Sequence, residues 1–177
     1  MEKLRYLEKI AMNNTKDFVF MHMMLPHPPF VFNEEGDVEV FENSEHFGGV
    51  WLDKDAYINQ LKFLNKKLIQ IFNKIFNKND IKPVFIIVSD HGPYITNPFE
   101  ANNNKQNLIN NRMQNFTSIF LPNLDKTKSK LNIQTTSLIN IFPIFFREYF
   151  GINFKLLEDK LFYSSYLEPY IFSEVKN

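Results

Sequence analysis

The chain has 177 residues, of which 44% are hydrophobic, and its 20 basic and 20 acidic side chains give a formal net charge of +0. This apolar content excludes a disordered polypeptide, which cannot bury enough apolar surface to offset the entropy of an ordered chain. The balanced charge argues against a general nucleic-acid-binding protein, which needs surplus Lys and Arg to displace counterions. Cysteine is absent, which excludes disulfide scaffolds, cysteine-ligated zinc and thiol catalysis.

Targeting segments are not evident in the sequence. Residues 1–12 alternate charged and apolar positions, whereas a signal peptide has an uninterrupted apolar run and a small-residue cleavage site. No stretch of the sequence approaches the roughly 18 apolar residues that a membrane-spanning helix needs. We therefore expect no anchor or export signal in these 177 residues, and we predict no location for the chain itself.

The first third of the chain predicts a helix, a strand and a loop. Residues 1–12 carry apolar side chains at helical spacing, which predicts a short helix. Residues 18–25 are almost wholly apolar, as is typical of a strand covered on both faces. The Pro-His-Pro-Pro run at 26–29 ends this strand, because proline removes ladder donors. Residues 33–52 are expected to form an acidic loop.

A long amphipathic helix is predicted next. Asp53 is a suitable N-cap, and the helical pattern continues to about Asn77. Apolar side chains recur at intervals of three or four residues and define the face expected to be buried. This face comprises Tyr57, Leu61, Leu64, Leu68, Ile71 and Ile75.

The second half of the chain predicts two more strands and another helix. Residues 83–88 indicate a second buried strand, and residues 116–121 a third. Between them, the Asn-rich segment 96–111 is expected to be a flexible surface loop. Residues 137–150 predict a helix that ends at Gly151. The tail from Leu156 is expected to be irregular.

This order of elements predicts an α/β fold. We expect a mixed, mostly parallel sheet flanked by helices, with at least one right-handed crossover connection. The sequence shows no internal repeat. The predicted domains are an N-terminal helical segment, residues 1–16, and one α/β domain, residues 17–177.

The strongest local signal for chemistry is the sequence Ser89-Asp90-His91-Gly92, directly after the second strand. In open α/β sheets, ligands bind beyond the carboxyl ends of the strands. Carboxylate oxygen and imidazole nitrogen suit zinc, manganese and similar divalent ions, so Asp90 and His91 are candidate metal ligands. In the alternative interpretation, Asp90 caps a turn or helix and His91 packs against it.

Two histidines lie near the end of the first predicted strand. His27 is held between prolines on a stiff backbone, which keeps a contact group in place at low entropic cost. Neutral imidazole binds metal, and protonated imidazole donates to an anionic oxygen. We interpret His27 as a substrate-binding residue. His22 is either a second one or a hydrogen-bonded core residue.

Arg112 is the third candidate for substrate binding. It follows the Asn-rich segment and precedes the third predicted strand. A guanidinium group can clamp a phosphate or sulfate through two parallel hydrogen bonds. A surface ion pair is the alternative and the commoner fate of an arginine.

Taken together, these motifs resemble the later half of the catalytic domain of the sulfatase/alkaline-phosphatase superfamily. The resemblance is closest to membrane-anchored sulfatase-like proteins, which include lipoteichoic acid synthases and phosphoethanolamine transferases. It runs in order from about residue 17 to 166. The matching segments are Phe20–Gly36, Tyr57–Leu68, Pro83–Gly92, Arg112–Pro122, Ser137–Phe142, Tyr149–Gly151 and Leu156–Asp159.

The resemblance implies a partial alkaline-phosphatase-like domain with a divalent metal ion (Zn, Mn, Mg or Ca) bound by Asp90 and His91. It implies that His27 contacts the transferred phosphate or sulfate. The implied substrate is an anionic phosphate or sulfate ester, such as a cell-envelope glycan or lipid, and nucleic acid is not an expected partner. The implied parent protein is membrane-anchored, with an extracytoplasmic catalytic domain.

The chain also departs from the family pattern. The family's nucleophile and an acidic metal ligand lie well upstream of the Pro-His turn, but only 26 residues precede His27 here. Several relatives carry another histidine about a dozen residues after the Asp-His pair, where this chain has asparagines at 102–104. We therefore identify no catalytic nucleophile and expect weak metal binding at half a site.

Two interpretations of function follow. In the first, the chain is a fragment of a metal-dependent phospho- or sulfo-ester hydrolase or transferase, inactive alone and completed by another half-domain or by self-association. In the second, it is a non-catalytic binding or partner subunit on the same scaffold. A fold does not fix a function, so the sequence leaves both open.

Overall fold

The computed structural model describes residues 2–11, 17–40, 46–47, 50–51, 53–78, 82–93, 95, 105–122, 136–165 and 167–175. The chain forms two compact units. The first comprises Met1–Lys82 with Tyr94–Asn103, and the second comprises Pro83–Pro93 with Asn104–Asn177. Residues 1–16 fall within the first unit, and the predicted boundary at residue 17 stays a prediction.

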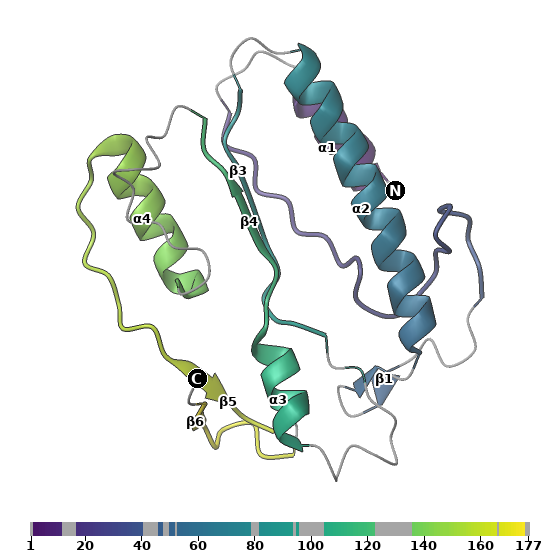
Figure 1. Ribbon diagram of the computed structural model, residues 1–177, viewed down its shortest axis with the longest axis vertical. Helices are drawn as coiled ribbons and strands as arrows, with labels where there is room; N and C mark the ends of the chain where they lie inside the picture. The colour runs from purple at the N-terminus through teal and green to yellow at the C-terminus, as the bar shows by residue number, and fades with distance from the viewer. Residues whose placement is uncertain are drawn as a thin grey trace. The chain divides into compact units, whose positions relative to one another are not determined.

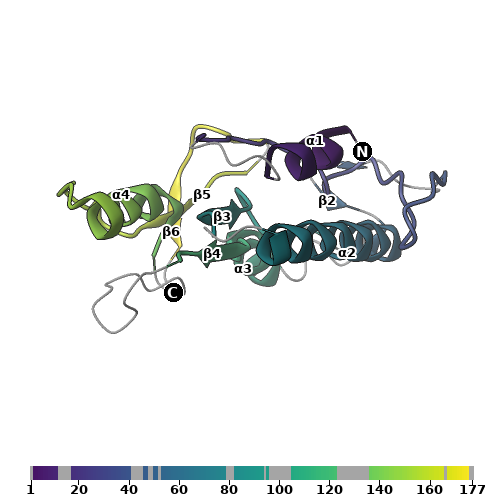
Figure 2. The ribbon, with the colours of Figure 1, turned by 90° about the horizontal axis from the view of Figure 1, so that it is seen from above.

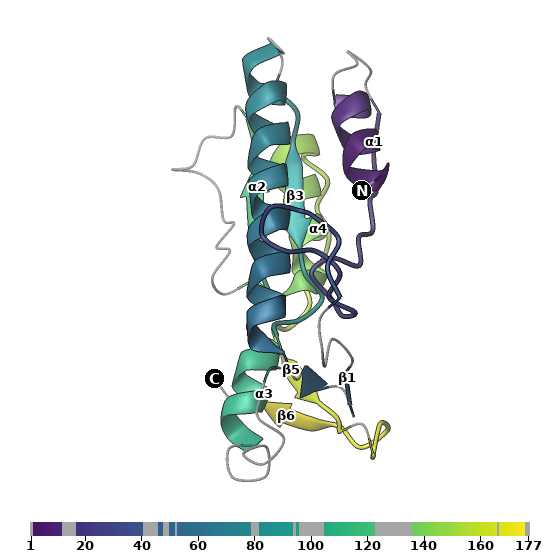
Figure 3. The same ribbon diagram turned by 90° about the vertical axis from the view of Figure 1, so that its right-hand side faces the viewer.

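Two helices dominate the first unit, and both were predicted. Helix α1 spans Glu2–Ala11 and lies alongside the long helix α2, Lys54–Lys78 (Figures 2 and 3). The backbone N–H of Ala56 donates to Asp53 Oδ1 at 2.8 Å, which confirms Asp53 as the N-cap of α2. The helix ends one residue beyond the predicted end.

The buried face of α2 differs in part from the predicted one. Ile71, Ile75 and Leu64 are buried as expected, whereas the other three predicted residues are only half-buried. The buried face also includes Phe63 and Ala56, at 1% exposure each, and one polar residue, Gln60, at 0% exposure. The face is therefore rotated slightly toward Gln60, which the apolar pattern alone could not indicate.

The first predicted strand is not formed. Residues 17–24 have no strand structure, and Phe18 and Phe20 are each 80% exposed. An apolar run becomes a strand only when a neighbouring strand completes its hydrogen bonds, and within the described residues nothing pairs with this segment. The segment is tied to α1 by one bond, from Lys3 Nζ to the backbone oxygen of His22 at 2.8 Å.

The predicted acidic loop contains local structure. The side-chain oxygen of Asn33 accepts three backbone N–H groups, those of residues 35–37, and closes a tight turn. Further along, β1, His46–Phe47, and β2, Val50–Trp51, form a short antiparallel pair. The sequence did not predict this pair, because two-residue strands leave no periodic pattern.

The second unit is built around two strands that lie side by side (Figure 1). Strand β3, Phe85–Val88, pairs with β4, Thr117–Phe120, with Phe85 opposite Phe120 and Val88 opposite Thr117. Both strands were predicted, but the pairing is antiparallel, as is that of every described sheet. The predicted mostly parallel sheet is therefore not found in the described part.

The error in strand direction has a physical reason. A continuous apolar run is typical of a parallel strand covered on both faces. Such a run indicates a preference for burial and carries no information on direction, which depends on the connection. In addition, β3 is only half-buried and Val88 is 44% exposed, so the strand is not enclosed.

Helix α3, Lys105–Met113, occupies part of the predicted surface loop. Asparagine is a weak helix former, so the Asn-rich sequence of residues 96–111 predicts a loop. Leu108 and Ile109 are buried at 5% and 9% exposure, and this packing outweighs the low helix propensity. Residues 96–104 lie outside the described part, so the prediction is wrong only for residues 105–111.

The C-terminal region contains α4, Leu138–Phe150, as predicted. Gly151 adopts φ 66° and its N–H donates to the carbonyl of Arg147, which confirms the predicted helix end. The tail is not wholly irregular, because β5, Leu161–Tyr163, and β6, Ser173–Val175, form an antiparallel pair. In the described residues, no helix combines the length and apolar character needed to span a bilayer.

The start of α4 is fastened by Asp159. One carboxylate oxygen of Asp159 accepts the Ser137 backbone N–H at 2.8 Å and the Asn140 side-chain amide at 3.0 Å. The hydrogen bond from the Ser137 hydroxyl, followed by that from its backbone N–H, lowers the pKa of Asp159. The fully buried Asn140 also exchanges two hydrogen bonds with the backbone of Leu157, so the tail is joined to the helix.

Candidate functional site

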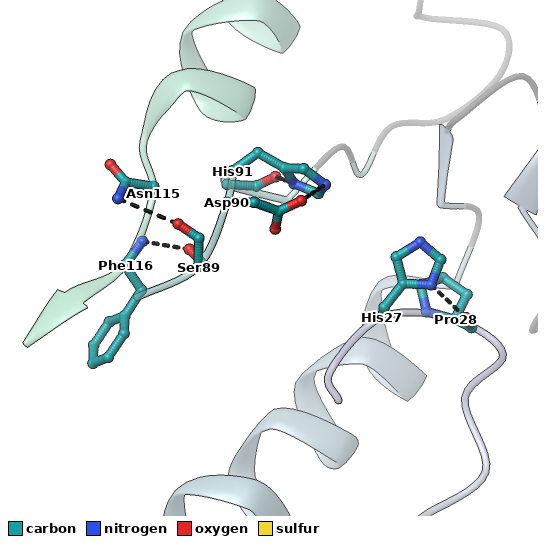
Figure 4. Close-up of polar contacts among 8 residues, drawn as sticks. His27, Pro28, Ser89, Asp90, His91, Asn115 and Phe116 are labelled. Atoms are coloured by element: carbon teal, nitrogen blue, oxygen red, sulfur yellow. Dashed lines mark hydrogen bonds and ion pairs between the residues drawn. The ribbon is translucent and has the colours of Figure 1, made fainter. Parts of the chain in front are cut away.

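The Ser89–Gly92 turn begins where β3 ends, and hydrogen bonds fix it to the start of β4. The Ser89 N–H donates to the Phe116 carbonyl at 2.9 Å. The Phe116 N–H donates to Ser89 Oγ at 2.7 Å (Figure 4). The Asn115 side-chain amide reaches Thr117 Oγ1 at 2.9 Å. The turn therefore leaves the sheet in a defined direction.

Gly92 closes this turn by direct contact with the end of α3. Its N–H donates to the Arg112 carbonyl at 2.8 Å. A Cβ atom added at Gly92 would lie 2.0 Å from the Asn111 carbonyl oxygen and 2.4 Å from that of Gln114. Both atoms belong to the backbone and cannot swing away, so this position accepts only glycine.

Asp90 and His91 stand side by side on the turn (Figure 4). The Asp90 side chain is 88% exposed and the His91 side chain 23%, and His91 Nε2 lies 3.5 Å from Asp90 Oδ2. His91 Nδ1 bonds to the Gly92 carbonyl at 2.8 Å. Because a carbonyl oxygen only accepts, Nδ1 carries the proton in this contact and Nε2 carries the lone pair.

This arrangement fits two ligands of one divalent cation. Histidine ligands commonly donate their second ring N–H to a backbone carbonyl, which fixes the tautomer and the ring orientation. Tetrahedral bonds of about 2.0–2.1 Å place two ligand atoms roughly 3.3 Å apart, close to the observed 3.5 Å between Nε2 and Oδ2. Among the described residues, no group of three His, Cys, Asp or Glu side chains is placed to hold a metal ion.

His27 belongs to the first unit, in the Pro-rich turn that was predicted. Its backbone N–H donates to the Met24 carbonyl at 2.7 Å, and its ring Nδ1 bonds to the Pro28 carbonyl (Figure 4). The carbonyl again makes Nδ1 the donor and Nε2 the nitrogen with the lone pair. The ring is thus half-buried in a fixed orientation.

Gln60 fixes this turn through hydrogen bonds, a role that the sequence did not predict. Its side-chain nitrogen lies 3.3 Å from the carbonyl oxygens of both Pro26 and His27, and its oxygen accepts the Val31 N–H at 2.9 Å. One signal was present in the sequence. Gln60 stands four residues before Leu64 and three after Tyr57, so it is a polar residue within an apolar helical stripe.

The remaining candidates separate between the two units. Arg112 lies in the last turn of α3, and its backbone carbonyl bonds to Gly92. The structure therefore brings Arg112 beside the Asp90–His91 turn, in the same unit. His22 is exposed in the segment that precedes His27, so its alternative interpretation as a core residue is wrong, and its contact with Lys3 uses the backbone alone.

The described part of the chain is a mixed α/β structure with an Asp-His turn directly after a strand. A sequence model of the Sulfatase family matches residues 3–147. The match covers most of the chain, so the chain belongs to the sulfatase family, as the resemblance implied. Domains of this family generally bind a divalent metal ion. The chain has no significant match among curated proteins or solved structures.

Proposed function

We propose that this chain is a sulfatase-like protein that binds a divalent cation through Asp90 and His91 beside a phosphate or sulfate ester. The observation that carries the proposal is the 3.5 Å separation of Asp90 Oδ2 and His91 Nε2, with the proton of His91 held on Nδ1 by the Gly92 carbonyl. A bound cation would supply Lewis acidity toward the ester oxygens. The candidate ions are Zn, Mn, Mg and Ca, and titration with each ion distinguishes among them.

Each side chain has a role in this proposal. Asp90 contributes the negative charge, and His91 presents Nε2 in a fixed orientation. Arg112, beside this turn, can donate to an anionic oxygen. His27, held in its own turn, contacts the ester and donates to it when the ring is protonated. The resemblance to lipoteichoic acid synthases and phosphoethanolamine transferases makes a cell-envelope glycan or lipid our proposed substrate, and a membrane-anchored protein the proposed parent.

Metal titration tests the cation site directly. We expect calorimetry with Zn²⁺ or Mn²⁺ at neutral pH to show weak binding of one ion, because two protein ligands fill only part of a coordination shell. Asp90→Ala and His91→Ala should each abolish it. Asp17→Ala, which removes an exposed carboxylate elsewhere, should leave it unchanged. Absence of binding to the wild-type chain would refute the metal site.

Turnover is the second test of the proposal. We propose that the 177-residue chain alone is inactive, because no nucleophile with the family's setting was identified in it. We therefore expect negligible hydrolysis of p-nitrophenyl phosphate and p-nitrophenyl sulfate, with or without added metal. A robust metal-dependent rate, lost in His91→Ala, would show that the chain supplies a complete active site.

A non-catalytic partner subunit is the second candidate function. It is favoured by residues 17–24, which pair with no strand among the described residues and in which Phe18 and Phe20 are each 80% exposed. Such a segment offers both hydrogen-bonding groups and apolar surface to another chain. Light scattering at rising protein concentration tests this idea. Association that Phe18→Ser/Phe20→Ser abolishes would support it, and a monomer at all concentrations would count against self-association.

A further inference from the structure

The Pro-rich turn at 26–29 has few backbone donors with which to form hydrogen bonds of its own. Proline has no N–H group, and three of these four residues are prolines. His27 therefore provides the only backbone donor of the turn, and it is already used by the Met24 carbonyl. The carbonyl groups of the turn need donors from elsewhere if they are to be paired.

Gln60 supplies that donor from the middle of α2. Its side chain is fully buried, with 0% exposure, and its NH₂ group faces the carbonyls of Pro26 and His27 at 3.3 Å each. Its oxygen accepts the Val31 N–H at 2.9 Å. One amide therefore joins the start of the turn to the chain that leaves it, and both amide functions are used.

We infer that Gln60 is the positioning residue for His27: its buried amide fixes the Pro-His-Pro turn and, through it, the direction of the His27 ring. The link to the ring is the bond from Nδ1 to the Pro28 carbonyl, because this carbonyl belongs to the turn that Gln60 holds. If the turn shifts, the Pro28 carbonyl moves away from the ring, and the proton of the neutral imidazole is no longer held on Nδ1. The inference rests on the proposed function only for the role of His27 toward an anion.

The packing around Gln60 supports this role. Ala56 lies one helical turn before it and Leu64 one turn after it, at 1% and 6% exposure. A glutamine between such neighbours cannot turn to solvent, so its amide is directed at the loop. The desolvation of a buried amide is offset only when its hydrogen bonds are made.

The first experiment measures the His27 ring without any ligand. Long-range ¹H–¹⁵N NMR at pH above the imidazole titration reports which ring nitrogen carries the proton. In the wild-type chain we expect His27 to be protonated on Nδ1. In Gln60→Met, which keeps the length of the side chain without its hydrogen bonds, we expect the Nε2–H tautomer that free histidine favours. His91, whose Nδ1 bonds to the Gly92 carbonyl, is the internal control.

The matched control is Gln70→Met, an exposed glutamine on the same helix, which should leave the His27 spectrum unchanged. Far-UV circular dichroism establishes that each variant is folded. A folded Gln60→Met chain with the wild-type His27 tautomer would overturn the inference. If the variant does not fold, side-chain amide exchange in the wild-type chain decides. If the Gln60 side-chain NH₂ exchanges at least tenfold more slowly than that of Gln70, the inference that Gln60 fixes the turn is supported. Equal exchange rates overturn it.

A second arm connects the inference with anion binding. Inorganic sulfate is titrated while the His27 signals are followed at a pH where the ring is protonated. We expect Gln60→Met to weaken the response of His27 by at least fivefold and Gln70→Met to leave it unchanged. If His27 of the wild-type chain ignores sulfate, the proposed anion contact fails, while the tautomer experiment still decides whether Gln60 positions the ring. An unchanged sulfate response in Gln60→Met would overturn the positioning role.

Discussion

The two turns that carry candidate functional residues, one in each unit, are stabilised in different ways. The turn at 26–29 depends on a single buried side chain, Gln60, which lies more than thirty positions away in the sequence. The turn at 89–92 depends on its own backbone, which bonds to Phe116 and Arg112. In the first turn the Gln60 amide supplies the donors that the prolines lack. In the second turn Gly92, which has no Cβ, allows the backbone to pack closely against the end of α3.

This difference indicates where each turn is vulnerable. Proline fixes φ but lacks the N–H donor, so the carbonyl groups of a Pro-rich turn need donors from outside the turn. A turn that follows a strand can extend the ladder of that strand, and its stability depends on how closely the backbones approach. Substitutions at a distance should therefore loosen the first turn, whereas substitutions within the turn should break the second.

The largest effect is expected for Gly92→Ala. The new Cβ would lie 2.0 Å from the Asn111 carbonyl oxygen, and we expect a loss of about 3 kcal/mol in the free energy of unfolding, the upper end for overpacking. Urea denaturation measures it. Gly151→Ala is the control, since a Cβ there meets nothing within 4 Å and only the φ of 66° is unfavourable. It should cost about 1 kcal/mol. Equal losses would refute the close-contact explanation.

Gln60→Leu is expected to have the next largest effect. It removes three hydrogen bonds from buried groups around the first turn, and a loss of about 2 kcal/mol follows, at about 1 kcal/mol or less for each net bond. Gln70→Leu, at an exposed position on the same helix, should change stability by less than about 0.5 kcal/mol. A wild-type denaturation midpoint for Gln60→Leu would show that the first turn holds without the amide.

Ser89→Ala tests the side-chain bond that joins the second turn to the Phe116 N–H. It removes the oxygen that accepts the Phe116 N–H at 2.7 Å, so we expect a loss of about 1 kcal/mol. Hydrogen exchange should become faster at the Phe116 amide and stay unchanged at the Gly92 amide, which bonds to Arg112. Faster exchange at both positions would mean that the hydroxyl, and not the backbone, holds the second turn.

The sequence predicted the features that rest on local chemistry. Asp53 and Gly151 mark the correct ends of two helices, because capping depends on neighbouring residues alone. The Asp90–His91 turn was expected at the end of a strand and lies there. Features that depend on distant partners were not predicted. The direction of β3 depends on β4, and the apolar run at 18–25 has no partner strand among the described residues.

Gln60 illustrates the same limit within the candidate site. Its position in an apolar stripe can be read from the sequence, and a buried polar side chain needs partners. Nothing in the sequence says that these partners are the carbonyls of Pro26 and His27. The chemical groups of the site could therefore be predicted, whereas the means by which the first turn is held required the structure.

The smallest effect on stability is expected for Asp90→Asn, in contrast to the large effect of Gly92→Ala in the same turn. The carboxylate is 88% exposed, and removing its charge leaves no buried group without a hydrogen bond. Stability should therefore change by less than about 0.5 kcal/mol, although Gly92 lies only two residues away. Divalent-cation binding should nevertheless be lost, because the amide supplies no negative charge to the ion. If Asp90→Asn lowers stability as much as Ser89→Ala, the carboxylate serves the turn itself, and the alternative interpretation of Asp90 as a cap is correct.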